Sequence, residues 1–235
     1  MQQTLAAQAL NASLAPKLAR AAIAVAGVGA WFLTQSLLGS RGFPAGIGDG
    51  LHVFLTPLTE WLAAHRGMTN LLLIVTSLVI DALGCFLLAS GVTGPTVRPL
   101  LGLGLVFALR QICQALIALP PPPQMIWRNP GIPSLLVTYD TGNDFFFSGH
   151  TAIAVYGAAE LWHRGHPWLK VAAALIAALE ISTVLVLRAH YTMDVLTAVL
   201  AALWTFSVAV KLAPSCDRLL ARAFMRRPAG VRPRS

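Results

Sequence analysis

Apolar residues fall into six long runs, separated by shorter polar or proline-rich segments. A run of about 20 apolar residues matches the ~30 Å hydrocarbon core of a bilayer, so each run predicts a membrane-spanning helix. The runs lie at 18–38, 70–90, 99–119, 148–162, 167–187 and 191–212, and the fourth is the shortest. The expected fold class is all-α, an integral membrane bundle of six transmembrane helices. It would occupy residues 18–212, between an N-terminal segment (1–17) and a basic tail (213–235).

The segments between the runs have patterns of their own. In 48–64, apolar side chains recur at helical spacing. This predicts a short helix in the membrane interface, anchored by Trp61, although a polar-flanked loop fits equally well. Residues 120–147 begin with four prolines, so we expect a stiff, extended connection there. The first run is too long for a signal-peptide core and lacks a clear cleavage site, so we expect it to be retained.

Composition excludes a water-soluble globule. Hydrophobic residues make up 56% of the chain, charged residues 11%, and the mean hydropathy is +0.68, whereas soluble domains carry about 25% charged residues. The formal net charge of +8 suits nucleic acid or an anionic membrane. The hydropathy decides for the membrane, so no nucleic-acid partner is expected. Three cysteines cannot build a disulfide framework, and their spacing does not indicate structural zinc.

Basic residues divide unequally between the two sides of the predicted bundle. Of the 17 Lys and Arg residues, twelve fall on the side of the termini, four on the other side, and Arg110 inside the third span. Cytoplasmic loops carry the excess of Lys and Arg, so both termini are expected to be cytoplasmic. The connections 40–68 and 120–147 then face outward. This predicts a site on the periplasmic face of a bacterial inner membrane. The basic tail is expected to lie on the membrane or to be disordered.

The first polar cluster reads Asn-Asp-Phe-Phe-Phe-Ser-Gly-His-Thr at 143–151, where the fourth span begins. Ser148 is expected to cap the helix, and Gly149 lets a ligand approach the backbone closely. His150 falls in the first turn. Free N–H groups and positive potential at a helix N-terminus suit phosphate, so Ser148 and Gly149 are candidate phosphate-binding residues.

The second cluster reads Arg-Ala-His-Tyr-Thr-Met-Asp at 188–194, where the last span begins. His190 and Asp194 are four residues apart and share one helix face, so the carboxylate can fix the imidazole tautomer and stabilise its charged form. His190 is therefore a candidate nucleophile or base. Arg188 offers a forked cation for phosphoryl oxygens.

Two histidines, an aspartate and an arginine thus meet at one membrane face, which predicts a single active site. Hydrocarbon tolerates such groups only when they face a cavity or one another. A metal site is the chemical alternative, because His150, His190 and Asp194 supply the ligand types of a two-His, one-carboxylate triad.

These motifs carry a family resemblance. Ser148-Gly149-His150 resembles the SGH core of the type 2 phosphatidic acid phosphatase superfamily. The longer stretches 144–151 and 190–194 resemble the two signature motifs of its sphingomyelin synthase branch. Arg110 and the residues after it, running to Leu-Pro-Pro-Pro at 119–122, are similar to that branch's arginine motif.

The chain departs from the family pattern at two positions. Gln114 stands where the arginine motif often has a second Arg, and Val184 stands where the phosphatases carry an Arg upstream of the last His. The second departure favours the synthase branch over an ordinary lipid phosphate phosphatase.

The resemblance implies a mechanism through a phosphohistidine, without metal or cofactor. His190, oriented by Asp194, would attack phosphorus, and His150 would protonate the leaving alkoxide and then deprotonate the acceptor. The phosphate-binding residues would be Arg110, Arg188, Ser148 and Gly149. Supporting positions around the site would be Asp144, Tyr191 and Glu180.

Three acidic residues fall inside the spans. Asp81 and Glu180 are expected to pair with Arg110, or in the case of Glu180 to reach the floor of the site. Glu160 is expected to be solvated at the cytoplasmic face. His52, on the outer side, is expected to be interfacial.

The expected function is lipid headgroup transfer. Phosphocholine or phosphoethanolamine would pass from a glycerophospholipid to ceramide, diacylglycerol or another lipid alcohol. The alternatives are hydrolysis at the same site, as in a phospholipase C or a lipid phosphatase, and a non-catalytic lipid-binding protein. Membrane lipids are the expected partners, and a homo-oligomer is left open.

Overall fold

The computed structural model describes residues 2–40, 47–137, 139 and 145–225, without side-chain detail at 2–13, 38, 224 and 225. All regular structure within those residues is helical. The helices are α1 (Gln2–Gly39), α2 (Gly50–Ala64), α3 (Arg66–Thr93), α4 (Arg98–Leu116), α5 (Gly149–His163), α6 (Pro167–Val186) and α7 (Thr192–Met225).

Five of these helices are long and apolar enough to cross a membrane, which supports an integral membrane protein. They are α1, α3, α4, α6 and α7, and they coincide with five of the six predicted spans. The remaining prediction, 148–162, corresponds to α5. This helix has 15 residues and rises about 22 Å, which is short of the ~30 Å hydrocarbon core. The count of six full spans is therefore not confirmed.

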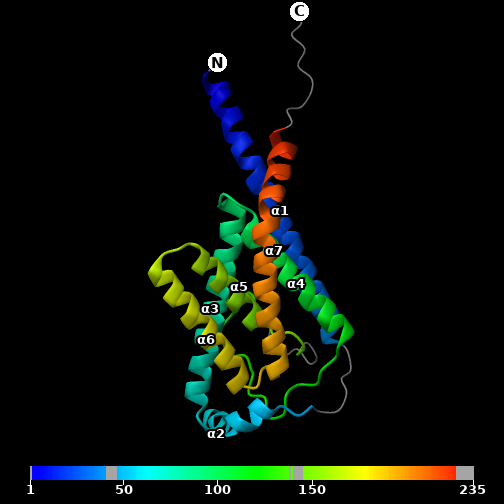
Figure 1. Cartoon of the computed structure of the whole chain (residues 1–235), viewed down its shortest axis with the longest axis vertical. Helices are drawn as coiled ribbons and strands as arrows, with labels where there is room; N and C mark the ends of the chain where they lie inside the picture. The colour runs from blue at the N-terminus through cyan, green and yellow to red at the C-terminus, as the bar shows by residue number, and fades with distance from the viewer. Residues whose placement is uncertain (1, 41–46, 138, 140–144, 226–235) are drawn as a thin grey trace, which may run out of the picture.

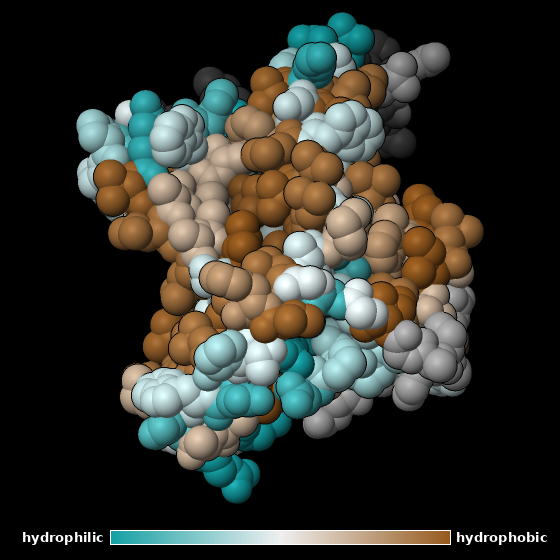
Figure 2. Space-filling model, turned by 60° about the horizontal axis from the view of Figure 1, so that its bottom comes forward, coloured by the Kyte–Doolittle hydropathy of each residue, from teal (hydrophilic) through white to brown (hydrophobic). Residues whose placement is uncertain are grey.

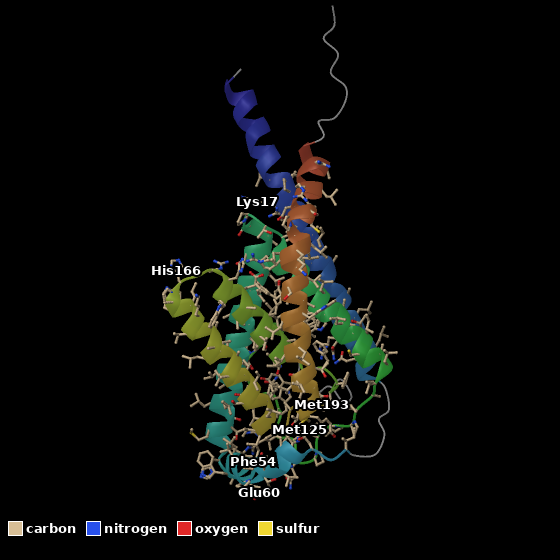
Figure 3. All side chains as sticks on the ribbon, in the orientation of Figure 1. Lys17, Phe54, Glu60, Met125, His166 and Met193 are labelled. Carbon is tan, nitrogen blue, oxygen red and sulfur yellow. The ribbon has the colours of Figure 1, made fainter. Side chains whose placement is uncertain are left out.

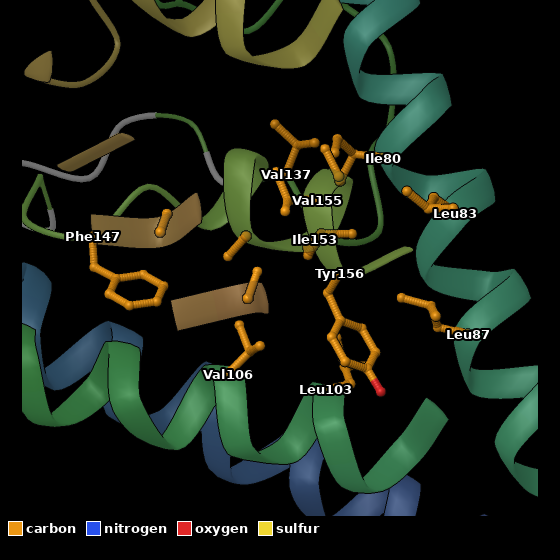
Figure 4. Close-up of a cluster of buried hydrophobic side chains, with 14 residues drawn as sticks. Ile80, Leu83, Leu87, Leu103, Val106, Val137, Phe147, Ile153, Val155 and Tyr156 are labelled. Carbon is orange, nitrogen blue, oxygen red and sulfur yellow. The ribbon is translucent and has the colours of Figure 1, made fainter. Parts of the chain in front are cut away.

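Helix α5 is largely buried among the other helices. It packs most extensively on α6 and α7 and also contacts α3 and α4. Tyr156 is fully buried, and Figure 4 shows it among apolar side chains of α3 and α4. Gly102 lets the Tyr156 ring lie directly against the α4 backbone, because a Cβ there would overlap the phenol. This contact fixes the position of α5, including its first residues, along the length of α4.

The two ends of the bundle differ in structure. The first turns of α1 and the last turns of α7 lie at one end, whereas α2 crosses the opposite end together with the proline-rich connection (Figure 1). Figure 3 shows Lys17 and His166 toward the first end, and Glu60 and Met125 at the second. On the face drawn in Figure 2, hydrophobic residues dominate the middle and hydrophilic ones gather toward the ends.

Helix α2 confirms the helical alternative for 48–64. Asp49 caps its N-terminus by accepting hydrogen bonds from the backbone N–H groups of Leu51 and His52. The described part of the proline-rich connection forms no helix or strand, as expected. At the other end, α7 continues past the predicted limit of its span to Met225, so the first half of the expected tail is helical. Residues 226–235 lie outside the described part.

Candidate active site

The beginnings of α5 and α7 lie side by side. The backbone N–H of Ser148 donates to the carbonyl of Asp194 at 3.3 Å, which joins the two polar clusters directly. Ser148 caps α5 as predicted, since its hydroxyl accepts from the N–H of Thr151. His150 lies in the first turn of α5, and His190 precedes α7 by two residues.

Four of the sequence-predicted residues line one cavity of about 120 Å³: Arg110, Gly149, His150 and His190. Three different helices or helix ends supply them, and all three polar side chains are buried. Apolar and aromatic side chains complete the wall: Trp31, Ile80, Phe107, Met125, Trp127, Leu136, Phe145, Ile153 and Ala189. The cavity therefore combines two imidazoles and a guanidinium with apolar and aromatic walls.

The His190 imidazole is oriented by a backbone carbonyl. Its Nδ1 lies 2.9 Å from the carbonyl oxygen of Phe145. Because a carbonyl only accepts, Nδ1 carries the proton in this contact and Nε2 carries the lone pair. The tautomer is the one that a nucleophile acting through Nε2 requires.

Asp194 has a different role from the one expected. Its carboxylate oxygen lies 3.9 Å from His190 Nδ1, beyond hydrogen-bond distance, and accepts instead from the N–H of Tyr191 at 2.9 Å. Asp194 thus caps the start of α7. The contact from His190 Nδ1 to Asp194 is longer than the contact to Phe145, so the Phe145 carbonyl orients the ring. Phe145 was missed from the sequence because a backbone carbonyl leaves no compositional signal.

Arg110 lies against the N-terminus of α5. Its guanidinium donates to Gln35 Oε1 on α1 at 2.5 Å. A Cβ added to Gly149 would lie 3.3 Å from Arg110 Nε, so glycine makes this close approach possible. A guanidinium therefore lies against a helix N-terminus, where positive potential favours phosphate binding.

The terminal nitrogens of Arg188 are engaged by the protein. One donates to the Pro123 carbonyl and the Gln124 side chain, and the other to the His52 carbonyl and the Thr56 hydroxyl, all at 2.7–3.0 Å. Arg188 does not line the cavity. Its backbone has φ +51°, in the left-handed region, and these four bonds hold it there. Phosphate binding by Arg188 stays a prediction, and it would require an exchange of these bonds.

Helix α2 and its cap support the turn that carries His190, between α6 and α7. His52 Nε2 donates to the carbonyl of His190 at 3.0 Å, and Asp49 accepts from the N–H and hydroxyl of Thr192. Thr59 adds a bond to the Val186 carbonyl. His52 is buried against this turn, and its place at the membrane interface stays a prediction. The contacts between α2 and α6–α7 span more than a hundred residues of sequence, which hides them from motif analysis.

The charge states of Asp49 and His52 follow from their surroundings. Burial and the nearby Arg188 lower the pKa of His52 below its ordinary value of 6.5, although Asp49 opposes the shift. Burial acts to raise the pKa of Asp49, but hydrogen bonds from Thr192 and His52 outweigh it, so the net shift is downward. At neutral pH, Asp49 is charged and His52 is neutral.

The proline-rich connection covers the site. The Trp127 ring meets the His150 ring edge-on, with centroids 4.8 Å apart, and stacks on Tyr139 on its other side. Tyr191 is buried and stacks on His52, and burial raises the pKa of its phenol. The sequence predicted a stiff, extended connection; the connection also contributes part of the cavity wall.

The acidic residues in the helices have partners other than Arg110. Glu180 accepts from the Thr76 hydroxyl, and Asp81 accepts from the 134–136 segment. Glu160 is buried and holds Arg98 through two bonds, so the prediction that it is solvated is wrong. Asp144 lies outside the described residues.

The metal alternative has no geometric support in the described part of the chain. No group of three or more His, Cys, Asp or Glu side chains there is arranged to hold a metal ion. The Asp194 carboxylate belongs to the helix cap, as described above.

Comparison with known proteins agrees with the position of the site. Residues 141–211 match the family model described as PAP2 superfamily C-terminal, and this stretch contains both histidine clusters. The match supports assignment of this region to the type 2 phosphatidic acid phosphatase superfamily, whose members act on lipids as phosphatases or phosphotransferases. No curated protein and no solved structure matched the chain.

Proposed function

We propose that this membrane protein is a lipid headgroup phosphotransferase of the sphingomyelin synthase type. It would transfer phosphocholine or phosphoethanolamine from a glycerophospholipid to ceramide, diacylglycerol or another lipid alcohol. The observation that carries the proposal is the shared cavity of His150, His190 and Arg110. The single superfamily match supports the broader chemistry.

In the first half-reaction, His190 Nε2 attacks phosphorus while the bond from phosphorus to the diacylglycerol oxygen breaks. The Phe145 carbonyl keeps the lone pair on Nε2, because it holds the proton on Nδ1. His150, in its protonated form, gives its proton to the departing alkoxide. Arg110 and the N-terminus of α5 balance the charge on the non-bridging oxygens.

In the second half-reaction, the now neutral His150 removes the proton from the acceptor hydroxyl. The acceptor oxygen forms a bond to phosphorus, and the bond from phosphorus to Nε2 breaks. The two steps thus use the same two histidines: His150 is protonated at the start of the first and neutral at the start of the second, while His190 gains and then loses the phosphoryl group. The aromatic cover over His150 keeps water away from the phosphohistidine, which favours a lipid acceptor.

The test supplies purified protein in lipid vesicles with phosphatidylcholine or phosphatidylethanolamine, with and without ceramide or diacylglycerol, and measures lipid products by mass spectrometry. His190→Ala should lower turnover by about a thousandfold or more. His166→Ala, at the opposite end of the molecule, is the matched control and should retain activity. Transfer yields diacylglycerol together with a new phospho-headgroup lipid.

Other products would decide between the alternatives. Formation of diacylglycerol with free phosphocholine or phosphoethanolamine would show that the protein hydrolyses the donor rather than transferring its headgroup. If the wild type turned over no donor and lipid binding survived His190→Ala, the protein would be a lipid-binding protein and not an enzyme.

A further inference from the structure

A second cavity, of about 290 Å³, lies between α1, α3 and α4. Three residues, Trp31, Phe107 and Leu136, line both this cavity and the candidate active site, so the two adjoin. The active-site cavity carries the charged and titratable groups. The second cavity is lined by aliphatic side chains, aromatic rings and glycines, with Thr34 and Gln111 as its polar members.

We infer that this second cavity binds a hydrocarbon chain of the lipid whose phosphate reacts at His190. The inference rests on the proposed function and names a second part of the same binding site. We call it the α1–α4 groove, defined by Ile23, Gly27, Trp31, Gly104, Phe107 and Gln111. A polar pocket that opens into an apolar groove matches the division of a phospholipid into headgroup and chain.

The groove contributes position more than affinity. A lipid chain leaves one hydrocarbon medium for another when it enters the groove from the bilayer, so little hydrophobic free energy is gained. The shared wall fixes the distance from the chain to the phosphate. When a lipid chain occupies the groove, it therefore holds the phosphorus atom near His190 Nε2, which favours the reaction by orienting the substrate.

Gln111 lies where the polar linkage of a lipid would pass. It follows Arg110 directly in α4 and lines the groove. Both polar atoms of its side chain are buried and have no hydrogen-bond partner among the described residues. Buried amides cost free energy when unpaired. A carboxamide donates and accepts, so it fits the ester carbonyl or the amide between a headgroup and its chain.

Two glycines, one on each of the helices α1 and α4 that line the groove, are positions where a larger side chain can test it. A Cβ at Gly27 of α1 or at Gly104 of α4 would meet no atom within 4 Å, so a leucine at either position can begin without a clash and is expected to occupy the groove. Gly29 of α1 has equally open surroundings but does not line the groove. Gly29→Leu is therefore a matched control for Gly27→Leu on the same helix.

The first measurement does not depend on turnover. His190→Ala protein in vesicles is irradiated with a phosphatidylcholine that carries a diazirine in its acyl chain, and the cross-linked peptides are identified by mass spectrometry. Cross-links should concentrate at 23–34 and 100–111. Gly27→Leu and Gly104→Leu should lower them about tenfold, whereas Gly29→Leu should leave them unchanged. Equal labelling in Gly27→Leu and Gly29→Leu, or labelling spread evenly over α6 and α7, would overturn the inference.

The second measurement compares turnover of long-chain and short-chain donors. Gly27→Leu should lower kcat/KM about tenfold for the long-chain donor and leave the short-chain donor unaffected, in contrast to Gly29→Leu. Equal effects on both donors would contradict the proposal that the groove binds a lipid chain. If the wild type turned over no donor, the proposed function would fail, while the cross-linking pattern would still decide whether the groove holds a lipid chain.

Discussion

At the scale of single residues, the site depends on how closely side chains approach the N-terminus of α5. Glycine at position 149 lets Arg110 lie against the helix end, with Gln35 holding the far side of the guanidinium. The positive charge thereby sits next to His150 rather than one turn away. A change of one methyl group is enough to test this arrangement.

Gly149→Ala should lower kcat/KM about tenfold without destabilising the fold. The new Cβ, 3.3 Å from Arg110 Nε, displaces the guanidinium from the phosphate site, whereas alanine is a better helix former than glycine. Thermal unfolding and lipid turnover are measured together. Gly50→Ala is the control, since Gly50 also begins a helix and has no atom near its Cβ. Unchanged turnover in Gly149→Ala would mean that Arg110 does not bind the reacting phosphate.

At the scale of elements, α2 positions the His190 turn, although it contributes no side chain to the cavity. Asp49, His52 and Thr59 each bond to the chain between α6 and α7. Arg188 ties α2 to the proline-rich connection at the same point. Helix α2 is therefore part of the framework that orients the proposed nucleophile.

The lowered pKa of His52 predicts a loss of stability in mild acid. Between its ordinary value of 6.5 and the lower folded value, the unfolded chain binds a proton that the folded chain does not, so the free energy of unfolding falls as pH decreases below 6.5. Asp49 does not contribute in this window, because its pKa lies below 3.8 and its contribution is lost only at more acidic pH.

The measurement is the unfolding temperature from pH 7.5 to 5. His52→Gln keeps a side-chain N–H donor for the His190 carbonyl and cannot titrate, so its unfolding temperature should fall less with acid than that of the wild type. His65→Gln, at an exposed position, should behave as the wild type. Parallel curves for wild type and His52→Gln would show that His52 does not titrate on unfolding.

At the scale of the whole molecule, the bundle separates the termini from the site. Helix α2 and the proline-rich connection lie at one end, and the first turns of α1 and the last turns of α7 lie at the other (Figure 1). The cavity is lined by Met125 and Trp127 of the proline-rich connection. The distribution of Lys and Arg predicts that the end with the termini faces the cytoplasm. The site would then act on the outer leaflet.

Single-cysteine variants test this orientation in intact cells. After replacement of Cys85, Cys113 and Cys216 by serine, Glu60→Cys should react with a membrane-impermeant maleimide from outside. His166→Cys should react only after the membrane is opened. The two positions mark opposite ends of the molecule (Figure 3). Labelling in the reverse order would place the site on the cytoplasmic face.

The sequence by itself determined the membrane class, the positions of five long helices, the cap at Ser148 and the two histidine clusters. These are local properties: hydropathy over about 20 residues, and residue types at fixed spacing. The same hydropathy does not settle whether α5 is a full span, because a helix buried in protein is as apolar as a helix in lipid.

Tertiary structure alone decided the partners. The carbonyl that orients His190 is 45 residues away, Gln35 is 75 residues from Arg110, and His52 is 138 residues from the carbonyl it binds. Arg188 was predicted to bind phosphate because its charge is visible in the sequence, while its four acceptors are not. Hydrogen bonds join atoms that the packing of helices brings within about 3 Å. That packing depends on the whole chain, and no local pattern records it.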